Sequence, residues 1–518
     1  MGEIKYLDHK WDKLLSCDRT SEFKVTKGMR YYGFMNPWEE DYQQITTSYE
    51  FRRLKDKTQV FPLEKNDFVR DRLTHSIEVS GIAKQIFFIA IKNIKKNGFQ
   101  IKDDFINASS LLACSGLLHD IGNPPFGHSG EKAIRNWFLN KFNDPTFTFN
   151  GKKIGKLFDD SEFGDYKVYK TDLENFEGNA QAIRILLREG SPFNVTESLV
   201  ASLIKYPNRS LSFDSDSDKV YKHKIGYYES EREKVEKILD GMDLINKDSG
   251  EYYRHPLCYI LEAADDIAYL TADLEDGIKK KIISVKDIIQ DLEDKIILEA
   301  NNNLDERKDY EQVKKVLSEY KRYDKSRPQN EKNLYQLSLT NNLLDDLKEM
   351  IRKSENEIET FDEWIGIVRR WLIYCAGYAF SYRVNEIVNN NEYHELLSRE
   401  DVFHKYTHRF LREIEQKHLF PETTILEIQG EKIIDSLLEL FIPAVVNYDT
   451  PNKQTALEQK VISLISNSCI DSYRRVANNP GVDDITKLYY RFLMVTDYIS
   501  GMTDNYAKEL YKQINGLE

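Results

Sequence analysis

The chain is poor in the residues that build disulfide frameworks, thiolate metal sites and loop-rich folds. Its 518 residues include 13 prolines, 24 glycines and five widely scattered cysteines, at Cys17, Cys114, Cys258, Cys375 and Cys469. The cysteines are odd in number and form no C-x-x-C pair, which argues against both a disulfide scaffold and a thiolate zinc site. A reducing, cytoplasmic location fits this cysteine usage best.

Long apolar runs are missing as well. The run IFFIAI at residues 86–91 is far too short to cross a bilayer. The N-terminal stretch MGEIKYLDHKWDKLL lacks the basic start and apolar block of a secretory signal. We therefore expect no membrane span and no exported precursor.

The formal net charge is -13, with 41% hydrophobic and 31% charged residues. Such a charge repels nucleic acid and anionic membranes on average, although it does not describe local pockets. A polyanionic ligand would therefore need a local group of lysines and arginines, or a metal ion.

Apolar residues recur at three- and four-residue spacing along most of the chain, which predicts an all-α protein. We expect an N-terminal helical segment over 1–50, a catalytic core over 51–280 and a C-terminal helical region over 281–518 that packs on the core. Charged helices are expected over 280–360. One small β-hairpin is expected within 145–170, because Asn150-Gly151 favours a tight turn.

The stretch LLHDIGNPPFGHSGEKA, residues 117–133, crowds titratable groups around one helix end. A short buried helix is expected to end near His119-Asp120, because Gly122 and two prolines follow. A new helix is expected from about Gly130. Upstream, Asp71 is a candidate cap for a helix that would carry His75 in its first turn.

Further along, HPLCYILEAADDIAYLTADLEDG predicts a strong helix from His255. Asp265, Tyr269 and Asp273 follow one another at four-residue spacing and so lie on one stripe of it. A carboxylate near a core must be paired or bound to metal. The best partners for Asp265 in the chain are His75, His119 and Asp120.

Two imidazoles and two carboxylates make a nitrogen and oxygen ligand set that suits Mn, Mg, Fe, Co or Ni with open positions. A metal held this way can bind a phosphate oxygen and lower the pKa of its water. Each residue alone also has an ordinary explanation: a histidine can be a hydrogen-bonded core residue, and Asp265-Asp266 can be a solvated helix face.

The order H…HD…D is the pattern of the HD-domain phosphohydrolases, and longer blocks narrow the resemblance. FRRLKDKTQVFPLEKNDFVRDRLTHSIEVS, GLLHDIGNPPFGHSGEKAI, NFEGNAQAIRIL, LEAADDIAYLTADLEDG and DYISGMTDNYAKELY resemble the deoxyguanosine triphosphate triphosphohydrolases (dGTPases). These blocks run from residue 51 to 511 in the same order. The chain is therefore similar to that family over most of its length.

The resemblance implies a divalent metal ion, Mn²⁺ or Mg²⁺ among the candidates, and a role for each matching position. The implied metal ligands are His75, His119, Asp120 and Asp265, with Asp266 as the alternative to the last. His128 and Glu131 match the catalytic pair, although they could simply cap the next helix. The implied reaction is attack of water on the α-phosphorus of dGTP, or of several deoxynucleoside triphosphates (dNTPs), releasing deoxynucleoside and inorganic triphosphate.

The resemblance also implies how substrate is bound. The residues that match phosphate-binding positions are Arg72, Lys205, Tyr206 and Lys224, with Lys222 as a neighbour that could replace the last. Gln59 and Asp273 match residues that hold the 3′-hydroxyl, and Tyr269 matches the ring that excludes a ribose hydroxyl. Asn179 and Gln181 would belong to the base pocket or only to its support.

By analogy with the family we also expect a homo-oligomer, commonly a hexamer, and leave open a dNTP or single-stranded nucleic acid effector. Two other functions use the same ligands. One is another HD-type nucleotide phosphodiesterase, which gives no role to NPPFGHSGEKA or to the C-terminal block. The other is a dNTP-sensing regulator without turnover, which gives no role to a complete ligand set with His128 and Glu131.

Overall fold

A computed structural model of the chain describes residues 5–6, 10–21, 35–59, 69–159, 165–214, 217, 222–304, 307–390, 395–398 and 402–517. This part of the chain is helical, which confirms the predicted all-α class. The elements that surround the site described below are α2 (Pro37–Thr47), α4 (Arg72–Lys96), α5 (Asp103–Leu118), α6 (Gly127–Asn143), α9 (Gly178–Leu187), α10 (Glu197–Leu203), α12 (Pro256–Lys279), α16 (Glu357–Asn390), α17 (Lys405–Val445), α20 (Asp484–Ser500) and α21 (Asp504–Asn515).

The remaining elements are shorter or lie farther from the site. They are α1 (Lys10–Leu14), α3 (Tyr49–Arg52), α7 (Ile154–Asp159), α8 (Lys167–Glu174), η1 (Ser210–Ser212), η3 (Glu229–Glu231), α11 (Arg232–Gly241), α13 (Val285–Leu304), α14 (Tyr310–Leu317), α15 (Gln329–Lys353), α18 (Ala456–Ile462) and α19 (Asn467–Ala477).

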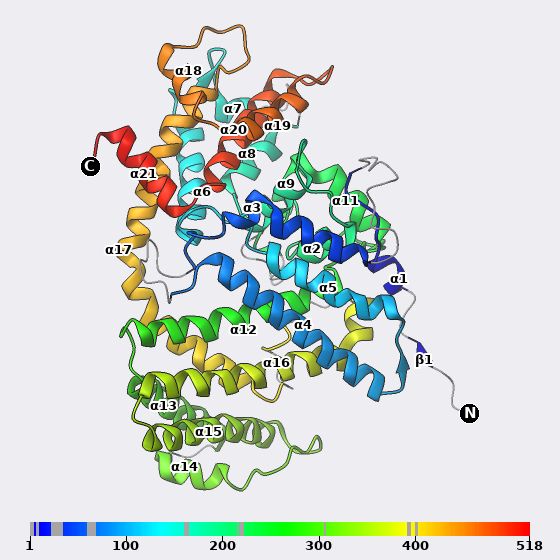
Figure 1. Cartoon of the computed structure of the whole chain (residues 1–518), viewed down its shortest axis with the longest axis vertical. Helices are drawn as coiled ribbons and strands as arrows, with labels where there is room; N and C mark the ends of the chain where they lie inside the picture. The colour runs from blue at the N-terminus through cyan, green and yellow to red at the C-terminus, as the bar shows by residue number, and fades with distance from the viewer. Residues whose placement is uncertain are drawn as a thin grey trace.

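The helices form one elongated body with α4 and α12 across its middle (Figure 1). α4 packs against α5, α12 and α16. The charged helices α13, α14 and α15 project at one end of the view, and α18, α19 and α20 lie at the other. α17 runs along one side between these ends and contacts both α12 and α6. The long helix therefore connects regions that are distant in sequence.

The hydrophobic core falls into two clusters that do not follow chain order. The larger contains buried residues of α4, α5, α12 and α16. The smaller joins Phe126 and the α6 residues Ile134 and Phe138 to Phe441 of α17 and Phe492 of α20. The C-terminal helices therefore pack directly on the segment that follows the HD pair, whereas the predicted domain limits at 50 and 280 stay a prediction.

Local sequence explains where the two central helices begin. Asp71 caps α4 by accepting a hydrogen bond from the Thr74 amide at 2.8 Å, and the Thr74 side chain accepts one from the Asp71 amide. His255 caps α12 by accepting from the Leu257 amide, and Pro256 occupies the first helical position. Both starts agree with the sequence prediction.

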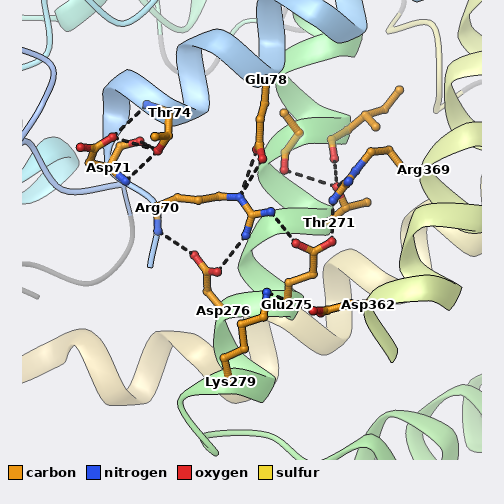
Figure 2. Close-up of polar contacts among 12 residues, drawn as sticks. Arg70, Asp71, Thr74, Glu78, Thr271, Glu275, Asp276, Lys279, Asp362 and Arg369 are labelled. Atoms are coloured by element: carbon orange, nitrogen blue, oxygen red, sulfur yellow. Dashed lines mark hydrogen bonds and ion pairs between the residues drawn. The ribbon is translucent and has the colours of Figure 1, made fainter. Parts of the chain in front are cut away.

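An ion cluster built on the buried carboxylates of Glu275 and Asp276 fixes α4 against α12 and α16 (Figure 2). Arg70 donates to Glu78 at 2.9 Å, to Asp276 at 2.8 Å and to Glu275 at 2.5 Å. Arg369 of α16 donates to the second oxygen of Glu275 at 2.7 Å. Because Arg70 stands immediately before the α4 cap, the cluster sets how the first turn of α4 meets α12.

The few strands are two residues long. β3 (Thr148–Phe149) and β4 (Lys152–Lys153) pair antiparallel around Asn150 and Gly151, both with positive φ. This confirms the predicted hairpin and its turn. β1 (Lys5–Tyr6) pairs in parallel with β2 (Phe99–Gln100), which the sequence did not predict.

The structure also bears on the predictions made for the cysteines and for membrane-spanning segments. In the described part of the chain none of the five cysteines forms a disulfide, and only Cys17 is exposed. Within the described residues, no helix combines the length and apolar character needed to span a bilayer. The segment from Pro207 to about Gly226 has the composition of a loop, and part of it, namely 215–216 and 218–221, lies outside the described residues.

Candidate active site

Three predicted metal ligands meet where α4, α5 and α12 converge. The ligand atoms of His75, His119 and Asp265 all lie within 4.8 Å of one another. His75 Nε2 lies 3.0 Å from Asp265 Oδ1, and His119 Nε2 lies 3.4 Å from the same oxygen. His75 comes from the first turn of α4, His119 from the residue after α5, and Asp265 from the middle of α12.

The donor atoms of this group fit a divalent cation. His119 Nε2 is buried and makes no well-formed hydrogen bond, while Nδ1 is fixed by the Gly116 carbonyl at 2.8 Å. Fixing Nδ1 in this way orients the ring and leaves Nε2 for another partner. Two imidazoles beside a carboxylate are ligands that first-row divalent metals and Mg²⁺ accept.

The electrostatics of the group agree with a cation between its members. Burial alone would lower the pKa of His119, but the carboxylates of Asp120 and Asp265 outweigh it and raise this pKa to about 9. Burial tends to raise the pKa of Asp265, yet His119 and His75 hold it well below its ordinary value. A positive charge at this point therefore stabilises the ionised carboxylates.

Asp120 borders the three-residue group. Its Oδ1 lies 3.6 Å from His119 Nε2 and accepts from Asn123 Nδ2 at 2.5 Å. Its Oδ2 accepts from Arg72 Nη1 at 2.5 Å, so the predicted phosphate-binding arginine is paired with the predicted metal ligand. A Cβ on Gly127 would lie 2.6 Å from Arg72 Nη2. Glycine at 127 therefore leaves the space that the arginine occupies.

Asp266, the alternative ligand, faces another element. Its Oδ2 lies 2.5 Å from His408 Nε2 and its Oδ1 lies 3.6 Å from Arg412, both on α17. The neighbouring aspartates of α12 therefore have different surroundings, and Asp265 is the one beside His75 and His119.

His128 and Glu131 lie one turn apart at the start of α6. His128 Nδ1 lies 3.0 Å from Glu131 Oε2, and Glu131 Oε1 accepts from the Gly178 amide at 2.8 Å. The hydrogen bond to Glu131 raises the pKa of His128. Burial would raise the pKa of Glu131, but the bond and the charge of His128 lower it to about 2. An exposed imidazole is thus held by a buried carboxylate.

The predicted phosphate-binding lysines approach the same space from the other side. Lys205 Nζ lies 3.1 Å from Glu262 Oε1, and Arg254 donates to the other oxygen of Glu262 at 2.9 Å. Lys224 donates to Glu177 Oε1 at 2.8 Å. Lys222, the open alternative to Lys224, pairs instead with Glu251 at 2.7 Å.

The predicted sugar-binding residues carry acceptor atoms with unfilled hydrogen-bonding capacity. Gln59 Oε1 and Asp273 Oδ2 are both buried without a hydrogen-bond partner in the described structure. Asp273 shares a hydrogen bond with Glu415 of α17, and burial raises the pKa of both groups, that of Glu415 to about 7. The Tyr269 ring lies edge-on to His75, with 6.5 Å between ring centres.

One cavity of about 590 Å³ collects most of these side chains. Its lining includes the following predicted site residues: Gln59, Arg72, His119, Asp120, His128, Glu131, Lys205, Tyr206, Lys224, Asp265 and Tyr269. His75 and Asp273 lie behind this lining and are buried. Asn179 lines the cavity, whereas Gln181 is buried behind it and donates to Asp497 at 2.7 Å.

Sequence reasoning missed several acidic residues of the same cavity. Glu177 and Glu262 hold the two lysines, and Glu415 comes from α17, far along the chain. Glu262 stands three residues before Asp265 on α12, so helical spacing alone could have flagged it. Nothing in the local sequence marks Glu415, because its position depends on how α17 packs across α12.

Known proteins resemble this chain over most of its length, and a family model covers the part that holds Arg72, His119 and His128 but not Asp265. The family model described as "HD domain" matches residues 72–246. A "deoxyguanosinetriphosphate triphosphohydrolase-like protein" of Listeria monocytogenes is 37% identical over 98% of this chain and 100% of its own length. A "deoxyguanosinetriphosphate triphosphohydrolase" of Yersinia enterocolitica is 30% identical over 94% of this chain and 95% of its own. A protein of the same name from Serratia proteamaculans is 28% identical over 94% and 95%.

Proposed function

Because this chain belongs to the deoxyguanosine triphosphate triphosphohydrolase family of HD-domain proteins, we propose that it hydrolyses dGTP to deoxyguanosine and inorganic triphosphate. Other dNTPs are candidate substrates of the same site. The observation that carries the proposal is one cavity that joins His119 and Asp265 to the His128 and Glu131 pair.

His75, His119 and Asp265 would hold a divalent ion, with Asp120 beside them. A bound ion of this kind neutralises phosphate charge and lowers the pKa of water toward neutrality. Mn²⁺ and Mg²⁺ are the candidates that the ligand set suits best. The orphaned Nε2 of His119 supports the assignment.

Cations of the chain would hold the triphosphate. Lys205 and Lys224 face the cavity while paired with one carboxylate each, and Arg72 is paired with Asp120. These carboxylates hold the cationic groups in place, which reduces the ordering cost when phosphate oxygens arrive. Arginine adds the bidentate geometry that phosphate favours.

His128 would act as the general acid of the reaction. Glu131 fixes Nδ1, so the second ring nitrogen is left for substrate. We assign to it the proton that O5′ of the leaving deoxynucleoside takes up when the bond from O5′ to the α-phosphorus breaks. The buried carboxylate of Glu131 keeps the imidazole oriented and favours its protonated form.

Gln59, Asp273 and Tyr269 would select the sugar. A 3′-hydroxyl donates one hydrogen bond and would supply a donor to one of these two buried acceptor atoms, Gln59 Oε1 or Asp273 Oδ2. An apolar ring rejects an added hydroxyl by roughly a hundredfold at most, so close packing against the 2′ carbon has to contribute.

A direct experiment is incubation of the protein with Mn²⁺ and each dNTP in turn, followed by chromatography of the products. We expect deoxynucleoside plus triphosphate, with dGTP turned over fastest. Deoxynucleoside monophosphate plus pyrophosphate would indicate an HD-type phosphodiesterase instead. Binding of dNTP without any product would indicate a sensing protein. The homohexamer, the dNTP or nucleic acid effector and the cytoplasmic location remain predictions.

A further inference from the structure

The first residue of the last helix reaches both walls of the cavity. Asp504 opens α21 and is 1% exposed. Its Oδ2 accepts from the Thr58 amide at 3.0 Å and from the Thr58 hydroxyl, and its Oδ1 accepts from the Phe126 amide at 3.0 Å. Thr58 precedes Gln59, and Phe126 stands two residues before His128. One carboxylate therefore ties together two segments that carry predicted site residues.

The Asp504 carboxylate does not cap the start of its own helix. Thr503 caps α21 by accepting from the Tyr506 amide at 3.2 Å. By contrast, Asp484 holds the same first position in α20 and is exposed to solvent. An aspartate in the first turn of a helix can interact favourably with the helix dipole while it stays exposed to solvent. The burial of Asp504 and its three hydrogen bonds therefore point to another role.

The turn that Asp504 holds has an unfavourable backbone. Phe126 has φ 63° and ψ 17°, in the left-handed region, and Gly127 follows with φ 55°. A residue other than glycine keeps such a conformation only where its surroundings fix it. Asp504 supplies an acceptor for the Phe126 amide, and Gly430 of α17 packs against the Phe126 ring so closely that a Cβ there would lie 2.7 Å from it.

Lys57, which precedes Thr58, connects this part of the chain to the turn after Asp120 and to the end of α20. Its buried Nζ donates to the carbonyls of Asn123 and Ser500, both at 2.7 Å. Its own carbonyl accepts from the Arg72 amide at 3.0 Å. Residues 57 and 58 therefore touch the start of α4, the turn after Asp120, the end of α20 and the start of α21.

We propose that Asp504 is a positioning residue for the reaction, and this proposal rests on the proposed function. Acting through Phe126, it holds the turn that presents His128; acting through Thr58, it holds the segment that presents Gln59. Thr58 and Phe126 line the cavity, whereas Asp504 lies behind them and does not face substrate. The C-terminal block DNYAKEL thereby gains a role in the geometry of the site.

The test uses the full chain with the Asp504→Asn substitution. Asparagine keeps one acceptor oxygen, and its amide NH₂ would face an N–H donor, so one of the two segments loses its partner. We expect kcat for dGTP to fall on the order of tenfold to a hundredfold, because a small displacement of reacting groups costs that much. We expect KM for dGTP to stay within about twofold of the wild-type value. The affinity for Mn²⁺, measured by calorimetry without nucleotide, should also stay within about twofold of the wild type.

Hydrogen exchange read by mass spectrometry gives a second measurement that does not depend on activity. A peptide covering residues 120–130, or one that contains Thr58, should exchange faster in Asp504→Asn, since the amide of Phe126 or of Thr58 loses its acceptor. Peptides of α13 and α15 should not change. The control is Asp484→Asn, the same substitution at the exposed first residue of α20, which should alter neither kcat nor exchange.

The outcomes separate this inference from the proposed function. A wild-type protein that releases no triphosphate rejects the function. An active wild type with Asp504→Asn unchanged in kcat and in exchange overturns the inference and leaves the function standing. Loss of Mn²⁺ affinity with faster exchange throughout the chain also overturns it, because that marks a general structural role. If Asp504→Asn does not fold, Thr58→Val decides through kcat, since it removes the hydroxyl donor to Asp504: kcat should fall with Mn²⁺ affinity kept, and an unchanged kcat overturns the inference.

Discussion

His75 Nε2 and Asp265 Oδ1 lie 3.0 Å apart although 190 residues separate them in the chain. α4 and α12 pack against each other, and Arg70, five residues before His75, is bonded to Glu275 and Asp276, which lie ten and eleven residues after Asp265 on α12. The contact between the two ligands is thus set by the way these helices meet.

Loss of one ligand should abolish metal binding and turnover together. We expect His119→Ala and Asp265→Ala to lose detectable Mn²⁺ binding in calorimetry and to lose at least about a thousandfold in kcat/KM. His418→Ala is the matched control, because His418 pairs with Asp291 on α13 and lies outside the cavity lining. Full activity in either ligand variant would contradict the assignment.

The pH dependence should follow His128 and Glu131. Glu131 raises the pKa of His128, so an imidazole that donates a proton stays active until the pH rises through that raised pKa. Glu131→Gln removes the carboxylate, and the alkaline fall in kcat should move to lower pH. His128→Gln should lower kcat by about 10²- to 10⁴-fold with Mn²⁺ binding intact. An alkaline limb that stays in place in Glu131→Gln would argue against this pair.

Discrimination against ribose should depend on the Tyr269 ring. Tyr269→Ala should reduce the preference for dGTP over GTP in kcat/KM by up to about a hundredfold. Tyr269→Phe keeps the ring and loses only the hydroxyl, which is hydrogen-bonded to Asp273. It should therefore keep most of the preference. Equal preference in the alanine variant and the wild type would show that the ring does not face the 2′ carbon.

The cluster of Figure 2 should contribute strongly to stability. Arg70→Met leaves Glu78, Glu275 and Asp276 without their shared cation, and breaking a buried ion pair from one side costs about 3–5 kcal/mol. Urea unfolding should report a loss of this order. Arg327→Met is the control, because its exposed pair with Glu331 contributes little. A loss in Arg70→Met no larger than in the control would contradict the interpretation.

Stability should depend on the protonation of Asp172. Burial raises its pKa from 3.8 to about 7, although Ser210, Tyr489 and the Glu229 amide donate hydrogen bonds to it. A raised pKa means that the folded state binds the proton more tightly, so this contribution is present below about pH 4 and is lost as the pH rises through about 7. The unfolding temperature of Asp172→Asn should therefore rise relative to the wild type between pH 5 and pH 8. A constant difference would contradict this.

Local patterns carried much of the fold prediction. The Asp71 cap, the helix start at His255, the turn at Asn150 and Gly151, and the helix end at Leu118 beside the HD pair all depend on neighbouring residues, and the structure has them close to where the sequence indicates. Helical spacing was less informative about burial: Leu73, Ile77 and Ile82 recur at helical intervals in the sequence of α4, yet Ile77 is 54% exposed.

Contacts between residues far apart in the sequence could not be predicted from local patterns. Asp265 and Asp266 are adjacent and chemically identical, and only the packing of α17 places His408 beside Asp266. The pairing of Lys205 with Glu262, and the reach of Asp504 to Phe126, likewise depend on how distant helices meet. The family resemblance identified the C-terminal block as a shared segment, but only the structure shows which residues this block contacts.

We propose that water attacks the α-phosphorus of dGTP at the site built around His119 and Asp265. The most direct measurement is hydrolysis of dGTP by the Mn²⁺-loaded protein in ¹⁸O-labelled water, with the products followed by ³¹P NMR and mass spectrometry. We predict one ¹⁸O atom in inorganic triphosphate and none in deoxyguanosine. Label in the deoxynucleoside, or release of pyrophosphate, would contradict it.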